Sequence, residues 1–260
     1  MQNDWLTVGE GDEAHRIAIR SRAGTNPGLL WLGGYRSDMR GTKAEELDNY
    51  AAKSGRAFRR FDYSGHGVSE GVFEECTISN WLEEAGRVLA LSQNPQIVVG
   101  SSMGGWLALL LAHEHRKRGG KGLIAGLILI APAVDMTQAL MWERMSKGAQ
   151  KQLSDRGIYF EPNPYGGEPT PITKKLIDDG LNHLFGDGLI EVGCPVHILQ
   201  GMCDAEVPWR DANELLQRLA SDDVVLTLVK DGDHRLSRPE DLSRLTDAID
   251  EMIHELTASS

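Results

Sequence analysis

The sequence has little positive charge and few cysteines. It holds 27 Lys and Arg against 38 Asp and Glu, which gives a formal net charge of -11 at pH 7. A surface of that sign repels nucleic acid and anionic membranes, so neither is an expected partner. The three cysteines, Cys76, Cys194 and Cys203, have neither CxxC nor Cys/His spacing, and the sequence therefore predicts no disulfide framework and no metal site.

Long hydrophobic runs are also lacking. The longest, LIAGLILIAPAV at 123–134, is too short to span a bilayer and is typical of a buried strand, so no stable membrane insertion is expected. The first 15 residues are polar and acidic, without the basic and apolar regions of a signal or transit peptide. From these absences we expect a cytoplasmic protein. The sequence indicates no oligomeric state.

Short apolar runs alternate with helix-like segments along the 260 residues. Several runs are rich in Val, Ile and Leu, as in strands covered on both faces, and 15–22 alternates like an antiparallel edge strand. The pattern predicts one α/β domain over 1–260, whose mostly parallel sheet carries helices on both faces. The expected strands are 15–22, 28–34, 57–65, 96–101, 126–132, 195–201 and 224–232, and the expected helices are 41–54, 77–92, 104–118, 209–221 and 239–257.

Residues 133–190 interrupt this alternation, because the segment is far longer than one crossover helix requires. We interpret it as an inserted helical lid, in which a Pro- and Gly-rich loop joins two helices. The first helical pattern has an apolar face with Trp142 and Met145, which either packs the lid onto the core or lines an acyl or aryl pocket. These two residues and Trp209 are the candidate substrate-binding residues.

One strand-like run ends in GSSMGG, which offers two serines as a nucleophile. Ser102 has Gly100 two residues before it and Gly104 two residues after it, as the G-x-S-x-G nucleophile elbow requires. Ser101 would have a valine and a methionine in those positions, where a tight strand-to-helix turn needs small residues. The pattern therefore predicts Ser102 as the nucleophile, at a turn between a strand and a helix.

A serine needs a base, and the base needs a group that orients it. When the nucleophile lies on such an elbow, the acid and then the histidine follow it in the chain. Asp204 follows the next-to-last expected strand and His234 follows the last one, so both are expected at the sheet edge where active sites lie. Glu206 is an alternative acid. His66 is a less favoured base, because it precedes the serine.

A tetrahedral oxyanion needs two hydrogen-bond donors. The backbone N–H of Met103, directly after the serine, is the first expected donor. The second is expected from the loop that begins WLGGY, where Gly33 and Gly34 let the backbone approach closely and the N–H of Tyr35 points into the site. A phosphate-binding loop is the other interpretation of this GG pair, but neither GxGxxG nor GxxxxGK[ST] follows, so nucleotide binding is not expected.

Five blocks of sequence together resemble the α/β-hydrolase fold: LGGYRSDMRGTKAEELDNYA, FRRFDYSGHGVSEG, QIVVGSSMGGWLALLLA, LQGMCDAEVPW and DGDHRLSRPEDL. More narrowly, they resemble the subgroup of mitochondrial palmitoyl-protein thioesterases that also cleave acyl glucuronides. The resemblance runs from about residue 15 to the final helix. It implies Ser102, Asp204 and His234 as the triad, and Met103 and Tyr35 as the oxyanion hole.

The sequence also departs from the family pattern. Gly33 stands where many members carry His or Pro, and Cys203 occupies a position that is often acidic. The lid is the least similar part, and it would decide the choice of substrate. Because no mitochondrial presequence is visible, we expect a bacterial-type cytosolic relative.

The combined expectation is a serine hydrolase that cleaves acyl esters or thioesters through an acyl-enzyme, without metal or cofactor. Its expected partner is a small-molecule or acylated substrate, and the resemblance implies S-acyl thioesters and acyl glucuronides. One alternative is a carbon–carbon bond hydrolase or lyase on the same triad. Another is a non-catalytic ligand receptor of the same fold, which the presence of all three triad residues disfavours.

Overall fold

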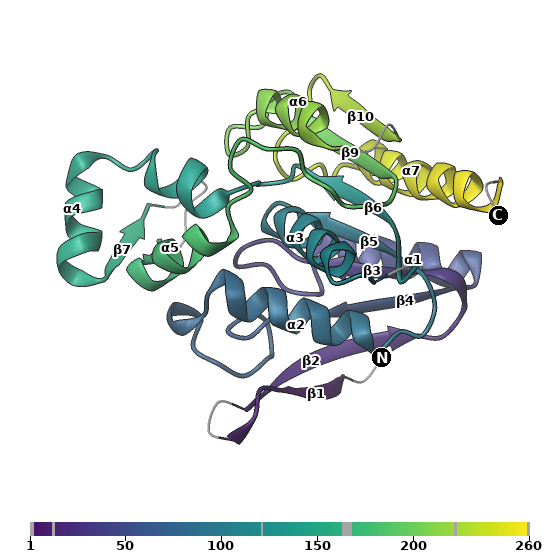
Figure 1. The fold of residues 1–260 in the computed structure, drawn as a ribbon, viewed down its shortest axis with the longest axis horizontal. Coiled ribbons are helices and arrows are strands. Elements are labelled where there is room, and N and C mark those ends of the chain that lie inside the picture. The colour runs from purple at the N-terminus through teal and green to yellow at the C-terminus, as the bar shows by residue number, and fades with distance from the viewer. Residues whose placement is uncertain (1–2, 12–13, 121, 163–167, 221–222, 259–260) are drawn as a thin grey trace.

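The computed structural model describes residues 3–11, 14–120, 122–162, 168–220 and 223–258. Its body is an eight-stranded sheet in the order β1-β2-β4-β3-β5-β6-β9-β10 (Figure 1). Pairing is parallel from β4 to β10 and antiparallel for β1 with β2 and β2 with β4, which confirms the predicted mostly parallel sheet. The strands are β1 (Asp4–Val8), β2 (His15–Arg22), β3 (Thr25–Leu32), β4 (Arg56–Phe61), β5 (Gln96–Ser101), β6 (Ile124–Ile130), β9 (Val196–Gly201) and β10 (Val224–Val229).

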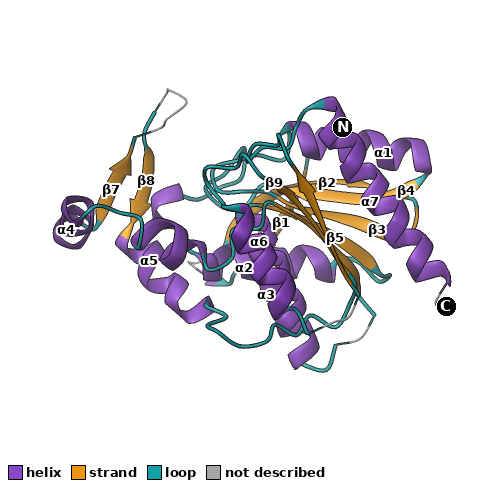
Figure 2. Ribbon diagram, turned by 90° about the horizontal axis from the view of Figure 1, so that it is seen from above, coloured by secondary structure: helices purple, strands orange, loops and turns teal. Residues whose placement is uncertain are grey.

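Helices cover both faces of this sheet (Figure 2). One hydrophobic cluster joins the sheet to α2, α3 and α6 around the fully buried Trp81 and Trp106, and a second joins the other face to α1 and α7. The central strands are apolar on both sides because each face is covered by helices. The helices are α1 (Thr42–Ser54), α2 (Ile78–Ala90), α3 (Met103–Lys117), α6 (Trp209–Arg218) and α7 (Pro239–Ala258), and a 3₁₀ turn lies at Phe73–Glu75.

The edge of the sheet differs from the sequence-based prediction. The expected edge strand 15–22 is β2, which lies between β1 and β4, so the prediction that it forms the edge is wrong. The edge on this side of the sheet is β1, a short strand in an acidic N-terminal stretch. Val8 is the only residue of this strand that is buried. Such a strand gains its order from pairing with β2 rather than from its own apolar content.

The insertion, which we define as the segment between Ile130 and Val196, forms a separate unit at one side of the sheet (Figure 1). The two expected helical patterns contain α4 and α5. The Pro- and Gly-rich segment expected to be a loop instead contributes a hairpin of β7 and β8, and its residues 163–167 lie outside the described part. The elements are a π-helical turn (Thr137–Trp142), α4 (Lys147–Arg156), β7 (Ile158–Glu161), β8 (Thr170–Thr173), α5 (Lys174–Gly180) and a 3₁₀ turn (Leu181–His183).

The insertion has a small core of its own, formed by Met145, Ala149, Leu153, Ile172 and Ile177. The first expected helical pattern is broken where Ser146 begins α4 by accepting a hydrogen bond from the N–H of Ala149. The lid bounds of 133–190 and the single-domain description stay predictions. Within the described ranges, no helix is long and apolar enough to cross a membrane.

The turn between β5 and α3 requires two glycines because backbone meets backbone there. A Cβ on Gly100 would lie 2.3 Å from the carbonyl oxygen of Gly104, and a Cβ on Gly104 would lie 2.1 Å from that of Leu32. Real Cβ atoms do not approach backbone so closely. The glycine spacing that singled out Ser102 in the sequence is therefore a packing requirement of the strand–helix turn.

We predict that Gly100→Ala lowers the free energy of unfolding by about 3 kcal/mol, because the clash is with backbone that cannot rotate away. Gly86→Ala is the matched control. Gly86 lies in α2, and its added Cβ would meet only Leu111 Cδ1, at 3.8 Å. That variant should be stabilised by about 0.5–1 kcal/mol. Denaturant unfolding measures both, and equal stability of the two variants would contradict the packing argument.

Candidate active site

Ser102 lies between the end of β5 and the start of α3 in a strained backbone conformation, with φ 55° and ψ −117°. Few non-glycine residues adopt such angles, and they persist only where the surroundings hold them. The N–H of Ser102 donates to the carbonyl of Ile130 at 2.9 Å, and its own carbonyl accepts from the N–H of Gly105, Trp106 and Ala133. These bonds hold the strained turn from both neighbouring segments.

The structure brings Ser102, His234 and Asp204 together from three separate loops. His234 follows β10 and Asp204 follows β9, as their positions in the sequence predict. His234 Nδ1 donates to Asp204 Oδ2 at 2.8 Å, and His234 Nε2 accepts from the Ser102 hydroxyl at 3.1 Å. A hydroxyl, an imidazole and a carboxylate in this order can move a proton from oxygen to nitrogen.

The surroundings of Asp204 keep its carboxylate ionised. Burial raises the pKa of Asp204, but the hydrogen bond from His234 and those from the backbone N–H of Val207 and Glu206 outweigh burial, and the pKa lies below its ordinary value. The two backbone bonds are both 2.8 Å long and reach Oδ1, whereas His234 binds Oδ2. Because an ionised carboxylate only accepts, the proton of His234 lies on Nδ1 and Nε2 faces the serine.

Gln200 also holds this loop, and sequence reasoning missed it. Its buried Nε2 donates to Asp204 Oδ2 at 3.1 Å and to the carbonyls of Gly201 and Val207. The available signal was an amide at the end of a largely apolar strand. Buried polar side chains of this kind need partners, and here the partners are the turn that presents the acid.

The loop that carries His234 is fastened at several points. Leu236 is buried, Arg238 pairs with Asp231 at 2.7 Å and with Asp241 at 2.8 Å, and Lys43 Nζ donates to the carbonyl of Arg235. These contacts attach the loop to the start of α7 and to α1, and they fix where the imidazole can lie.

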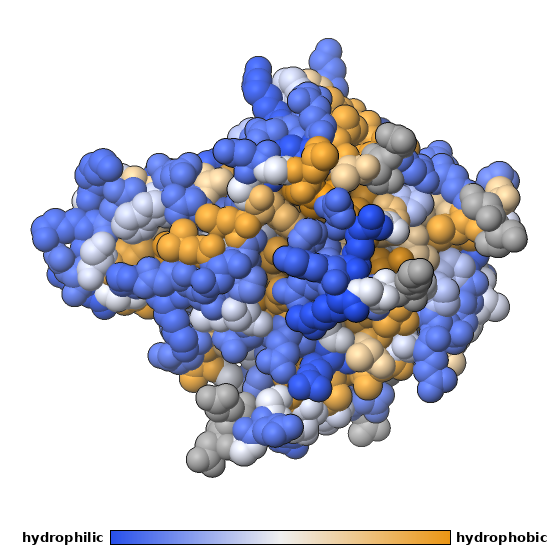
Figure 3. Space-filling view, viewed as in Figure 1, coloured by the Kyte–Doolittle hydropathy of each residue, from blue (hydrophilic) through white to orange (hydrophobic). Residues whose placement is uncertain are grey.

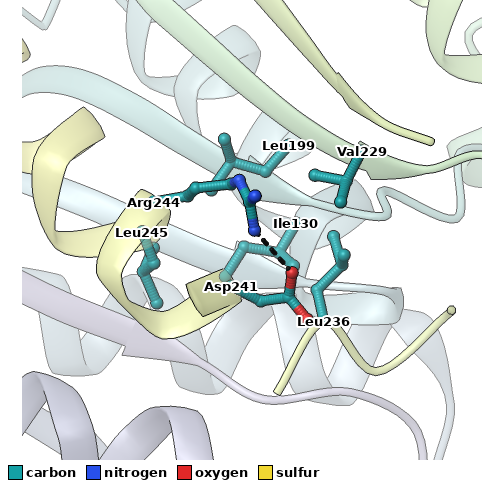
Figure 4. Close-up of a pocket in the computed structure, with 7 residues that line it drawn as sticks. All are labelled: Ile130, Leu199, Val229, Leu236, Asp241, Arg244 and Leu245. Carbon is teal, nitrogen blue, oxygen red and sulfur yellow. Dashed lines mark hydrogen bonds and ion pairs between the residues drawn. The ribbon is translucent and has the colours of Figure 1, made fainter. Parts of the chain in front are cut away.

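A pocket lies behind this loop, between α7 and the ends of the last strands (Figure 4). Its lining does not include the serine, the histidine or the aspartate just described. In the close-up Arg244 bonds to Asp241 at 3.0 Å over an apolar floor. We assign it a packing role beneath the His234 loop. The residues that line it are Ile130, Leu199, Val229, Leu236, Asp241, Arg244 and Leu245.

The two expected oxyanion donors, the N–H groups of Met103 and Tyr35, belong to the residue after the serine and to the loop after β3, and their role stays a prediction. Met103 is the first residue of α3, whose N-terminus favours negative charge. Tyr35 follows Gly34, and a Cβ on Gly34 would lie only 3.4 Å from Ser102 Cβ. Among the described residues, neither the N–H of Met103 nor that of Tyr35 donates a hydrogen bond.

The two less favoured candidates occupy other positions. The Glu206 carboxylate lies 3.5 Å from His234 Nε2, the nitrogen that faces the serine, and not at Nδ1 where Asp204 binds. His66 is buried, and its Nε2 accepts from the backbone N–H of Arg36 at 3.1 Å. The geometry thus favours Asp204 over Glu206 as the acid and His234 over His66 as the base.

The three candidate substrate-binding residues are dispersed. Met145 is buried in the core of the insertion, and the partly buried Trp142 packs against the same cluster. Trp209 begins α6, where the guanidinium of Arg210 lies 4.7 Å from the centre of its ring. For Met145 these contacts favour the packing interpretation, and the substrate contacts of all three residues stay predictions.

The loop that carries Tyr35 is bound to the insertion. The Tyr35 hydroxyl donates to the carbonyl of Pro171 at 2.7 Å, and Arg36 Nη1 donates to the carbonyl of Pro169 at 3.0 Å. Pro171 belongs to β8, so the hairpin of the insertion is attached to the loop that carries Tyr35. Burial raises the pKa of the Tyr35 hydroxyl well above its ordinary value, which keeps it a donor.

A family model described as the Alpha/beta hydrolase family matches residues 27–245. The chain belongs to the alpha/beta hydrolase family. This membership confirms the predicted fold, and the chain is therefore an enzyme of the hydrolase class.

Individual relatives agree with this assignment. The chain is 35% identical over 245 residues to bovine mitochondrial palmitoyl-protein thioesterase ABHD10, covering 93% of this chain and 78% of the relative. A solved putative hydrolase from Agrobacterium vitis S4 is 48% identical with a TM-score of 0.92, over 97% of this chain and 98% of that one. Mouse alpha/beta hydrolase domain-containing protein 10 is 33% identical with a TM-score of 0.87, over 98% and 100% of the chains.

We predict that Asp241→Asn destabilises the His234 loop by about 2 kcal/mol at pH 7, since Asp241 makes charged hydrogen bonds to Arg238. These bonds hold the pKa of Asp241 below its ordinary value, so the stability they contribute is present above about pH 4 and is lost as the pH falls through the folded pKa. Unfolding measured from pH 7 to pH 3 should show the two proteins converging in acid. A constant difference across that range would contradict the assignment.

We predict that Tyr35→Phe loosens the insertion while it leaves the backbone N–H in place, because only the bond to Pro171 is lost. Hydrogen exchange should then increase in β7 and β8 but not in β5. Tyr159→Phe is the control, since Tyr159 lies on the same hairpin and packs against the core of the insertion. Equal exchange in the two variants would mean that the Tyr35 hydroxyl does not hold the hairpin.

Proposed function

We propose that the protein is a serine hydrolase that cleaves acyl esters or thioesters, with Ser102 as nucleophile, His234 as base and Asp204 as its orienting acid. The observation that carries the proposal is the hydrogen-bonded series from Ser102 through His234 to Asp204, at 3.1 Å and 2.8 Å, on a strained turn. A serine hydroxyl reacts only when a base takes its proton, and the base acts only in the correct tautomer. The ionised carboxylate of Asp204 keeps the proton of His234 on Nδ1, which supports the tautomer that the base requires.

The reaction follows from these positions. As the Ser102 oxygen attacks the carbonyl carbon, its proton moves to His234 Nε2 and the carbonyl oxygen becomes negative. Collapse of this intermediate breaks the bond to the alcohol or thiol, which takes the proton from Nε2 and leaves an acyl-serine. Water then gives a proton to Nε2 as its oxygen attacks the acyl carbon. When this second intermediate collapses, the Ser102 oxygen takes that proton back from Nε2 and the carboxylic acid is released.

The backbone N–H groups of Met103 and Tyr35 are the proposed oxyanion hole. Two observations support this role: Met103 begins a helix whose N-terminal dipole favours negative charge, and the Gly34 backbone lies against Ser102. A donor that is already fixed before the reaction stabilises the oxyanion without reorganisation, which is the largest single contribution in many acyl-transfer enzymes.

We further propose a thioester of a fatty acyl chain as the preferred substrate. The name of the bovine relative, a palmitoyl-protein thioesterase, supports this class. The face in Figure 3 is largely hydrophilic, and hydrophobic residues form several separate areas on it, one of which crosses the side where Figure 1 places the insertion. An apolar chain would be desolvated most readily along such a surface.

The other expectations from the sequence concern two alternative functions and the cellular location. Membership of a hydrolase family disfavours a non-catalytic receptor, and no observation favours carbon–carbon bond cleavage. A cytoplasmic location stays a prediction, and the bovine relative carries the description mitochondrial.

We predict that Ser102→Ala abolishes both labelling by a fluorophosphonate probe and hydrolysis of p-nitrophenyl esters and acyl thioesters. Asp204→Asn should lower kcat by about 10⁴-fold, because it reverses the favoured tautomer of His234. Glu206→Gln should retain most activity, because the Glu206 carboxylate does not bind Nδ1.

A substrate panel of graded acyl length, as esters and as thioesters, then defines the preference. Labelling that survives Ser102→Ala would refute the proposed nucleophile, and a larger loss in Glu206→Gln than in Asp204→Asn would refute the proposed acid.

A further inference from the structure

The loop after β4 supports the loop that carries Tyr35. We call residues 33–40 the β3 loop and residues 62–70 the β4 loop. The N–H of Arg36 donates to His66 Nε2 at 3.1 Å, and the N–H of Met39 donates to Asp62 Oδ1 at 2.7 Å. Both bonds run from the backbone of the β3 loop to buried side chains of the β4 loop. The β3 loop is thus held at two positions, Arg36 and Met39.

The two peptide groups on either side of Tyr35 are held by different partners. The carbonyl of Gly34, which points opposite to the N–H of Tyr35 in the same trans peptide, accepts from the N–H and the hydroxyl of Ser37 at 3.1 Å and 2.7 Å. The next peptide is held by His66 through the N–H of Arg36. Arg36 itself has φ 58°, a left-handed conformation that a non-glycine residue keeps only when its surroundings impose it.

His66 is prepared to accept this hydrogen bond. Its Nδ1 donates to the carbonyl of Ser64 at 3.1 Å, so Nε2 carries the lone pair. Burial lowers the pKa of His66 to about 4, so the ring is neutral at physiological pH. The rings of Phe73 and Trp81 pack against it at 5.1 Å and 5.2 Å between centres and fix its plane.

The β4 loop is anchored in turn to the body of the protein. The N–H of Ser64 donates to Glu84 Oε2 at 2.9 Å, and Glu84 Oε1 bonds to His15 Nε2 at 2.8 Å. Glu84 lies on α2 and His15 begins β2, so the position of His66 is set by the sheet and by a packed helix. A side chain held in this way transmits the geometry of rigid elements to a loop.

We propose that His66 is a positioning residue of the oxyanion hole: its Nε2 holds the Arg36 peptide and thereby directs the N–H of Tyr35 toward Ser102. This inference rests on the proposed function, because it assigns the role to a loop that stabilises an oxyanion. His66 touches neither the serine nor the base. Its contribution acts through the backbone, and it is greatest in the transition state, where the oxyanion is present.

The test compares three substitutions that differ in one property. His66→Gln places an amide oxygen where Nε2 lies and keeps an acceptor for Arg36. His66→Asn is of similar polarity but too short to reach Arg36, and His66→Phe keeps the ring without any acceptor. We expect kcat to fall by about 100-fold in the Asn and Phe variants, since a misplacement of about 1 Å has that cost. The Gln variant should recover most of this loss, and KM should change little in all three.

A second readout separates positioning from general damage. A trifluoromethyl ketone analogue of the substrate forms an oxyanion on Ser102, so its inhibition constant should weaken in the same proportion as kcat/KM falls. His197→Gln is the matched control: His197 is equally buried, but lies on β9 away from the β3 loop. It should lower the melting temperature and leave kcat unchanged.

Three outcomes overturn the inference: full kcat in the Phe variant, a Gln variant no better than the Asn variant, or a loss confined to KM. If the Phe variant does not fold, the Gln and Asn pair decides alone. Failure of the proposed function is seen separately. In that case the wild-type protein does not hydrolyse acyl substrates, or the Ser102→Ala variant is still labelled by the fluorophosphonate probe.

Discussion

Close contact between backbone segments at the carboxyl edge of the sheet is the constraint on which the site depends. Gly100 and Gly104 let β5, α3 and the end of β3 touch without side chains between them. Gly201 does the same at the end of β9, where a Cβ would lie 2.4 Å from the carbonyl of Gly232 in the loop after β10. Because these three turns are so near, a serine, an aspartate and a histidine from distant parts of the chain come within hydrogen-bond distance.

Most buried polar side chains near the site form hydrogen bonds to backbone groups. Gln200 and Asp204 satisfy the turn after β9, and Asp62 and His66 satisfy the loop after β3. Each such group is costly to bury alone, and these hydrogen bonds offset that cost, although Gln200 Oε1 has no partner among the described residues. The result is a serine whose neighbours are fixed before any substrate arrives, which is what electrostatic stabilisation of a transition state requires.

The β3 loop is one of several connections between the insertion and the rest of the molecule, and the bond from Ser79 of α2 to Asp179 is another. The Tyr35 hydroxyl binds the hairpin of the insertion, and the backbone of Gly34, the residue before it, lies against Ser102. The insertion is also attached at the serine itself, since the N–H of Ala133 donates to the Ser102 carbonyl. A movement of the insertion would therefore act on the turn that carries Ser102.

The sequence by itself was sufficient to predict the parallel sheet, the strand–helix turn and the positions of Ser102, Asp204 and His234. Glycine spacing and residues at strand ends are local, so a single chain shows them. Only the tertiary structure decided that β1 lies at the edge, that β7 and β8 form a hairpin, and that Gln200 and His66 support the site. The partners of these elements lie far away in the chain or depend on burial, and no local pattern records which donor a buried acceptor will meet.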